Sequence, residues 1–245
     1  ALHWYREFIA SFPQQPETPA VNYQLADLLL ENRSFAAAAV EYEKTAYRYE
    51  RHEQSSKAGY AAVYSYRQHL QEVGEQERLQ VREETVRSSL LFAETFPEHE
   101  KAAIVQGAAA DDLYDMQEYK RALAAGRQLL DKFPTAETDV LRSAWLVVAH
   151  SCYELEQYAE AETGYLKVLE LFPDGDKSRA GLIDNLAAAI YRQGEQANAA
   201  EEFALAAEHF LRVTTLAPTS KIRPTAEYDA AAALIQAKDW SQAAT

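Results

Sequence analysis

The sequence predicts an all-α fold, an α-solenoid (superhelix) of antiparallel helix pairs. The first observation is composition: the 245 residues include 45 Ala but only 8 Gly and 8 Pro, which favours helix nearly throughout. The second is an aromatic–proline pair whose best examples recur at intervals of 37 and 39 residues. The third is a set of small and aromatic residues at helical spacing before each pair. Repeats of this length are typical of solenoids.

Composition also excludes several classes of protein. An apolar content of 48% is too high for a disordered chain, and a single Cys cannot form an internal disulfide framework. No apolar run approaches the length of a transmembrane segment. The net charge of −14 and a pI near 4.9 disfavour a nucleic-acid partner, because phosphates would be repelled.

The aromatic–proline pairs mark the repeat boundaries. Proline cannot continue a helix, so each pair is expected to end one helix and to begin the turn into the next repeat. The pairs are Phe12-Pro13, Phe96-Pro97, Phe133-Pro134 and Phe172-Pro173, with Ala217-Pro218 and Tyr49-Glu50 as degenerate members.

Small residues precede each boundary at a fixed distance, with an aromatic residue on either side in most repeats. Spacings of three and four place them on one helical face, where a small residue lets a neighbouring backbone approach. Twelve residues before the boundary stand Ala1, Ala38, Thr85, Ala122, Ala161 and Ala206. The preceding helix carries a second series: Ala26, Ala61, Ala110, Ala149, Ala187 and Ala231.

These signals divide residues 1–245, as one domain, into five complete helix pairs with a trimmed repeat at either end. The first helix ends near Phe12, and the last elements are a helix at 221–237 and another beginning at Trp240. Extra residues near 67–80 and 194–202 are expected to extend helices or widen a turn. The pairs are expected at 18–49, 53–96, 98–133, 136–172 and 176–217.

The repeat resembles the tetratricopeptide repeat (TPR) superfamily. Its clearest example is Ala149…Tyr158-x-x-Ala161-x-x-x-Tyr165…Pro173. The repeats depart from that family in running longer than its usual period of about 34 residues. The resemblance implies that ligands bind along a concave face made by the first helix of each pair.

Carried onto this chain, that face gives a set of predicted partner-binding residues. It is aromatic and acidic, which suits a protein or peptide partner with basic and apolar side chains. Chaperone-binding members of the family use Lys and Arg at these positions to clamp a carboxylate, but here the positions are mostly acidic or neutral, so that ligand is not expected. The residues are Tyr23, Asp27, Glu31, Asp111, Asp115, His150, Tyr153, Glu154, Asp184, Tyr191, Arg192 and Tyr228.

No pattern of residues predicts catalysis, a metal site or a cofactor. The six His and one Cys have no zinc-binding spacing, the Gly residues form no phosphate loop, and no nucleophile elbow is present. His150 and Cys152 are two residues apart, so on a helix they point to different faces, and Cys152 is interpreted as a small core residue.

The leading hypothesis is therefore a non-catalytic protein-interaction scaffold or adaptor. Segments such as 4–13 and 129–134 resemble bacterial envelope TPR proteins, namely outer-membrane assembly lipoproteins and Tol–Pal-associated periplasmic proteins. This implies a periplasmic or outer-membrane location in a Gram-negative bacterium, with a cytoplasmic location as the alternative. Two other hypotheses stay open: a helical-repeat region of a larger protein with its enzymatic or signalling module elsewhere, and self-association through open helix ends.

The assignment of helix faces predicts two opposite mutational outcomes. Asp111→Lys combined with Asp115→Lys should weaken binding of a basic partner, yet cost less than about 0.5 kcal/mol of stability per site. Ala161→Leu should cost roughly 1–3 kcal/mol, because a packed site has no room for it. Thermal unfolding of both variants checks this; an unfolded double-Lys variant or a tolerated Leu would show that the faces are wrong.

Overall fold

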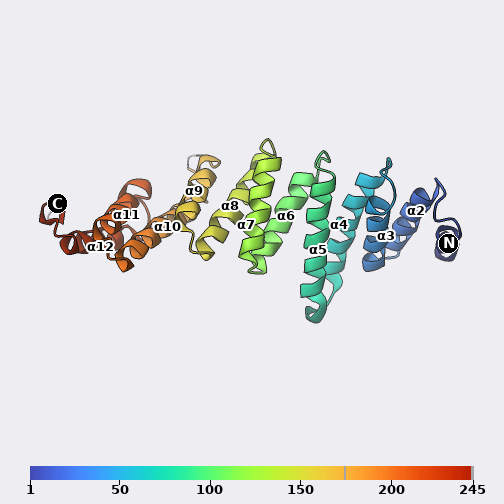
Figure 1. Cartoon of the computed structure of the whole chain (residues 1–245), viewed down its shortest axis with the longest axis horizontal. Helices are drawn as coiled ribbons and strands as arrows, with labels where there is room; N and C mark the ends of the chain where they lie inside the picture. The colour runs from blue at the N-terminus through green and yellow to red at the C-terminus, as the bar shows by residue number, and fades with distance from the viewer. Residues whose placement is uncertain (174, 244–245) are drawn as a thin grey trace. The chain divides into compact units, whose positions relative to one another are not determined.

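The computed structural model describes residues 1–173 and 175–243, with side-chain surroundings up to Ser241. All regular structure in these ranges is helical, with no strand, and within each unit most successive helices pack on one another (Figure 1). The all-α solenoid expected from the sequence is confirmed. The chain divides into two compact units, Ala1–Leu113 and Tyr114–Thr245, and each is described by itself. That 1–245 is one domain stays a prediction.

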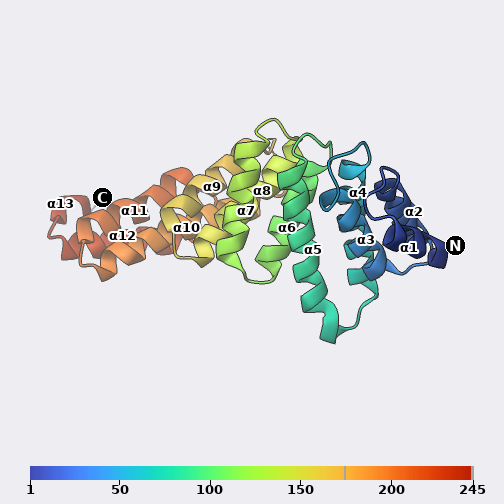
Figure 2. The same cartoon turned by 45° about the vertical axis from the view of Figure 1, so that its right-hand side comes forward.

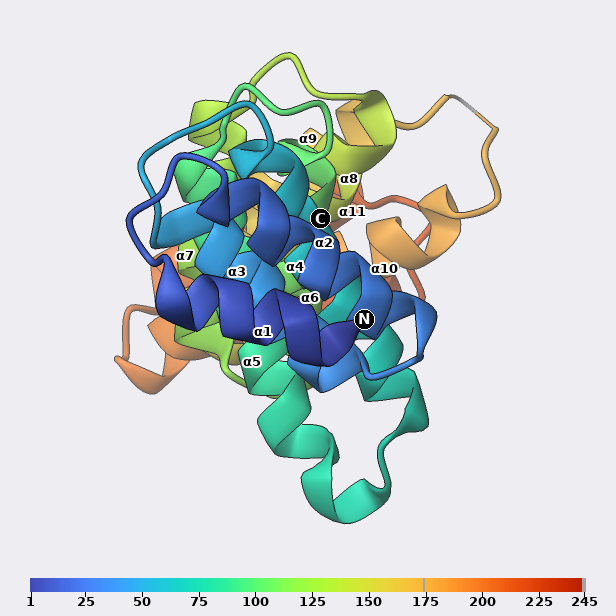
Figure 3. The same ribbon diagram turned by 90° about the vertical axis from the view of Figure 1, so that its right-hand side faces the viewer.

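Unit 1 contains α1 to α5 and most of α6. Helix α2 packs on α1 and α3, and α4 packs on α3 and α5 (Figures 2 and 3). The bounds are α1 Leu2–Ser11, α2 Thr18–Glu31, α3 Phe35–Tyr47, α4 Ser55–Glu72, α5 Glu75–Thr95 and α6 Ala102–Asp115.

Unit 2 contains the end of α6 and the helices that follow it. Each helix from α7 onward packs on the next one along the chain. The bounds are α7 Tyr119–Lys132, α8 Thr138–Glu154, α9 Tyr158–Glu170, α10 Arg179–Ala199, α11 Phe203–Leu216, α12 Arg223–Gln236 and α13 Trp240–Ala243.

The residues before the boundary prolines end helices, as the sequence predicts. Phe12, Phe96, Phe133 and Ala217 are the C-caps of α1, α5, α7 and α11, with φ from −135° to −123° and ψ from 53° to 58°. This backbone is outside the helical region, which the following proline disfavours. In the fourth pair the helix ends one residue earlier, since the C-cap of α9 is Leu171.

The turns between the two helices of a pair share one geometry that the sequence does not reveal. A non-glycine residue adopts a left-handed conformation in most of them, with φ from 57° to 61°. The backbone amide of the next residue then donates a hydrogen bond to the carbonyl five residues earlier. The Gln157 amide donates to the Cys152 carbonyl at 2.8 Å, and the Glu202 amide donates to the Ala197 carbonyl at 2.9 Å. This is the Schellman arrangement, which satisfies the last carbonyls of the first helix. The left-handed residues are Arg33, Gln117, Glu156, Glu201 and Lys238.

The two alanine series lie where paired helices touch. Ala38, Ala122, Ala161 and Ala206 are fully buried, and so are Ala26, Ala110, Ala149 and Ala187. The predicted register is wrong by one residue in two repeats: Ala61 and Ala231 are half-buried, whereas Ala62 and Ala230 are buried. Ala1 is exposed, because it only precedes the start of α1.

The extra residues lengthen helices. Helices α4 and α5 have 18 and 21 residues, and their hairpin extends beyond α2 and α3 in all three views (Figures 1, 2 and 3). Helix α10 has 21 residues and continues through Gly194, where a Cβ would stand 2.5 Å from the Phe210 ring. The longer period is therefore made of additional helical turns.

Two helical glycines provide a matched test of close helix packing. A Cβ on Gly164 of α9 would stand 2.8 Å from Ala149 Cβ and 3.0 Å from Ala149 Cα, whereas a Cβ on Gly181 of α10 meets nothing within 4 Å. Gly164→Ala should lower the free energy of unfolding by roughly 1–3 kcal/mol, and Gly181→Ala should raise it by up to about 1 kcal/mol. Urea unfolding of both variants measures this, and equal effects would contradict the close contact of α8 with α9.

Candidate functional site

The first helices of the pairs carry the predicted site residues, and in unit 2 these residues extend into an aromatic surface. We call it the tyrosine strip. Its rings are in contact in two groups, one around His150 and one around Tyr153. The strip consists of Tyr114, Tyr119, His150, Tyr153 and Tyr158, all half-buried.

His150 links the strip to the core of its helix pair. Its Nδ1 is 2.8 Å from the hydroxyl of Tyr165, and its ring lies 5.4 Å from that of Tyr165 and 5.8 Å from that of Tyr114. Burial lowers the pKa of the imidazole, and the charge of Glu154 opposes this only in part. His150 is thus held mainly as a neutral hydrogen-bonding group.

Two tyrosine pairs repeat along the strip. The rings of Tyr114 and Tyr119 are 5.4 Å apart, and those of Tyr153 and Tyr158, each 39 residues later, are 5.3 Å apart. Arg192 lies beside the second pair, with Nε 3.5 Å from the Tyr153 hydroxyl, and its Nη1 donates to Glu195 at 2.7 Å. The strip therefore already holds one guanidinium group against a tyrosine.

Two exposed carboxylates flank the first tyrosine pair. Burial raises the pKa of the Tyr114 hydroxyl, and the charges of Glu154 and Asp115 raise it further, so both carboxylates lie within electrostatic reach of that ring. Within the described part of the chain, no ion pair holds either of them. The arrangement combines aromatic surface with uncompensated negative charge.

The remaining predicted residues of unit 2 have different surroundings. Tyr191 donates to Asp229 Oδ2 at 2.5 Å, and burial together with this bond raises its pKa to about 12. Tyr228 is 76% exposed. Asp184 accepts from the Ser220 hydroxyl at 2.8 Å and from the Lys221 amide at 3.1 Å, so it fastens the turn before α12.

In unit 1 the predicted residues form a smaller cluster on α2. The hydroxyl of Tyr42 donates to Asp27 Oδ1 at 2.5 Å, and its ring is 5.5 Å from that of Tyr23. Burial raises the pKa of Tyr42, and the bond to Asp27 raises it further. Glu31 is exposed, and Asp111 on α6 is also exposed but has an interaction of its own within the chain.

The structure therefore brings together His150, Tyr153, Glu154 and Arg192, and engages Asp27 and Asp184 in internal hydrogen bonds. Sequence reasoning missed Tyr114, Tyr119 and Tyr158 as members of this surface. The sequence shows Tyr119 and Tyr158 as the aromatic residues three positions before Ala122 and Ala161, and that pattern predicts packing alone. That the listed residues bind a partner stays a prediction.

The described ranges contain neither a candidate metal site nor a candidate membrane span. No three His, Cys, Asp or Glu side chains among these residues lie close enough to hold a metal ion. None of the described helices is both long and apolar enough to cross a membrane.

No protein-family model matches the sequence. No curated protein matches it in sequence. The solved structures that are similar to it in fold include two repeat proteins. One, from Pyrococcus horikoshii, is a signal-transduction ATPase with numerous domains and a tetratricopeptide repeat sensor. It matches 93% of this chain and 38% of its own, at 15% identity and a TM-score of 0.44.

The other is the C-terminal part of a TPR repeat-containing protein from Cytophaga hutchinsonii. It matches 92% of both chains, at 14% identity and a TM-score of 0.35. This chain thus spans well under two thirds of the length of the Pyrococcus protein. At these identities and TM-scores, neither structure assigns a function or a partner to it.

The lowered pKa of His150 predicts that stability depends on pH. Because the folded-state pKa lies below the value of about 6.5 of an unfolded chain, the unfolded state binds the proton first as the pH falls. The contribution of His150 to the free energy of unfolding is therefore complete above pH 6.5, the unfolded-state pKa. It is lost as the pH falls from there towards the folded-state pKa. His209 acts in the same direction, because burial and then Arg212 lower its pKa.

We expect the free energy of unfolding to fall between pH 7.5 and pH 5.5, and His150→Gln to make this fall smaller. Urea unfolding at both pH values measures the effect, with a substitution at the exposed His3 as the control. An unchanged pH dependence in His150→Gln would mean that the imidazole takes up its proton as readily in the folded chain.

Proposed function

We propose that this chain is a non-catalytic scaffold of the TPR type that binds a segment of another protein over the tyrosine strip of unit 2. The observation that carries the proposal is the set of half-buried tyrosines on α6 to α9, flanked by Asp115 and Glu154. Tyrosine supplies large contact area at low entropic cost, and is enriched where proteins meet.

The charge of the strip indicates the chemistry of the partner. Arg192 is paired with Glu195, which leaves the charges of Asp115 and Glu154 uncompensated. A partner segment with Lys or Arg would complement them and be steered towards the strip. The proposal is supported by Arg192, whose guanidinium group already lies beside the Tyr153 hydroxyl.

The bacterial envelope is the compartment we propose, on the resemblance of segments 4–13 and 129–134 to envelope TPR proteins. The proposal that the chain is not an enzyme rests on the absence of a catalytic motif in the sequence and on the internal use of polar groups among the predicted site residues. Asp27, Asp184 and His150 each hold another part of the same chain.

Site-specific photo-crosslinking tests the proposal. A benzoylphenylalanine at Tyr153 or Tyr158 should crosslink one and the same protein in cells, whereas one at Lys167, an exposed position of α9 outside the strip, should not. Glu154→Lys in the Tyr153 variant should reduce that product about two- to tenfold, because it reverses a charge in the strip. Equal products from all three positions, or none from the strip, would contradict the proposal.

A further inference from the structure

A second surface of unit 2 lies outside the tyrosine strip. It is a groove of about 380 Å³ between α7 and α9, with α8 beneath. Trp145 and Val148 of α8 and Leu130 of α7 line it with apolar surface. This volume is at the lower end for a ligand pocket, and so suits one side chain better than a larger molecule.

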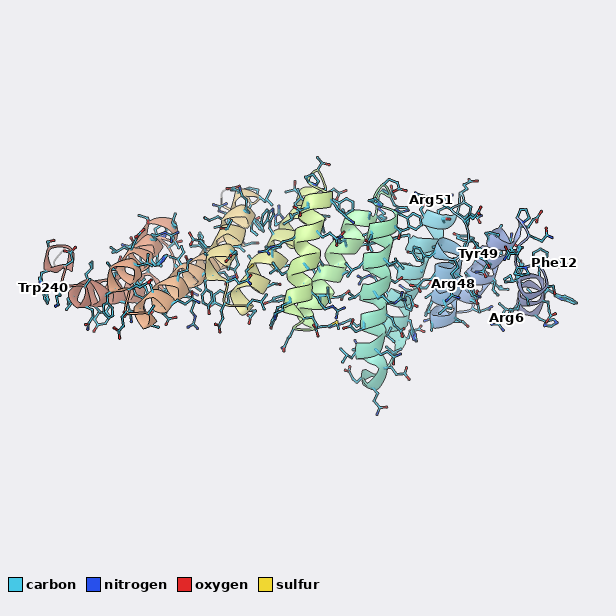
Figure 4. All side chains as sticks on the ribbon, viewed as in Figure 1. Arg6, Phe12, Arg48, Tyr49, Arg51 and Trp240 are labelled. Atoms are coloured by element: carbon cyan, nitrogen blue, oxygen red, sulfur yellow. The ribbon has the colours of Figure 1, made fainter. Side chains whose placement is uncertain are left out.

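The apolar part of the groove is well packed but not closed. Val148 is 4% exposed, and Trp145 and Leu130 are half-buried against the core. Trp4 and Trp240, by contrast, are 74% and 64% exposed; Trp240 stands on the short last helix α13 (Figure 4). Trp145 is thus a tryptophan that packing orders while part of its surface stays accessible.

The rim of the groove carries three charged groups. Asp131 of α7 and Glu160 of α9 are exposed, and no ion pair within the described residues engages either one. Arg127 is the third group, and its Nη2 lies 3.9 Å from the buried Sγ of Cys152. The guanidinium therefore neutralises the rim only in part, and the rim has a net charge of −1.

These features select among ligands. An anion would meet two carboxylates, and a purely apolar group would remove water from both without compensating them. A cation with an aliphatic stem satisfies both parts of the groove: the stem covers Leu130 and Val148, and the charge lies near the indole and the carboxylates. We propose that this groove recognises a lysine or arginine side chain of a partner polypeptide. It uses none of the residues of the strip, so it stands or fails separately from the function proposed above.

The fluorescence of Trp145 reports on the groove directly. In a Trp4→Phe, Trp240→Phe background, which changes only exposed positions, Trp145 is the sole tryptophan. The probes are three acetylated, amidated pentapeptides, Ala-Leu-X-Leu-Ala, with X as Arg, Gln or Glu. We expect the Arg peptide to cause a saturable change in Trp145 fluorescence. The Gln peptide should bind about two- to tenfold more weakly, and the Glu peptide more weakly still.

Variants that neutralise the two carboxylates of the rim test whether these groups recognise the basic side chain. Asp131→Asn and Glu160→Gln together should weaken binding of the Arg peptide about two- to tenfold and leave binding of the Gln peptide unchanged. Glu170→Gln is the control, since it removes one exposed carboxylate from the same helix α9 outside the groove. Equal binding of the Arg and Gln peptides, an equal loss in Glu170→Gln, or no saturable change at Trp145 would overturn the proposal.

Discussion

The close approach of the two helices in each pair is the contact on which the rest of the structure depends. It requires small residues at fixed positions, because a single additional carbon at Gly164 would collide with the backbone of α8 at Ala149. Ala149 and Ala161 are both fully buried at this contact. Aromatic side chains then fill the space on either side of it, so one steric requirement sets the spacing of both residue types.

The same contact also positions the polar groups of the candidate site. Asp27 follows the buried Ala26, and His150 follows the buried Ala149. Each polar side chain meets the tyrosine that lies four residues beyond the small residue of the second helix: Tyr42 for Asp27 and Tyr165 for His150. Acid and imidazole thus occupy equivalent positions, and their hydrogen bonds hold the edge of a surface that stays half open to a partner.

The sequence predicts the parts of this fold that depend on residue type alone. Phe-Pro pairs end helices because proline prevents their continuation, and buried alanines recur because no larger side chain fits. The left-handed turns at Gln117 and Glu156 could not be predicted, since the usual signal is a glycine and neither position has one. The roles of Asp184 and Trp145 could not be predicted either, because they depend on residues elsewhere in the chain: Ser220 for Asp184, and Asp131 and Glu160 for Trp145.

Helices that touch mainly their neighbours along the chain also affect how the protein loses its structure. Contacts of this kind make stability a sum over adjacent elements, so terminal pairs can open while inner ones persist. Helices α8, α10 and α12 would then exchange their amide hydrogens at different rates. A polypeptide bound across these three helices would have to dissociate before any one of them could open. Its binding free energy would therefore couple the opening of the three helices and make their unfolding more cooperative.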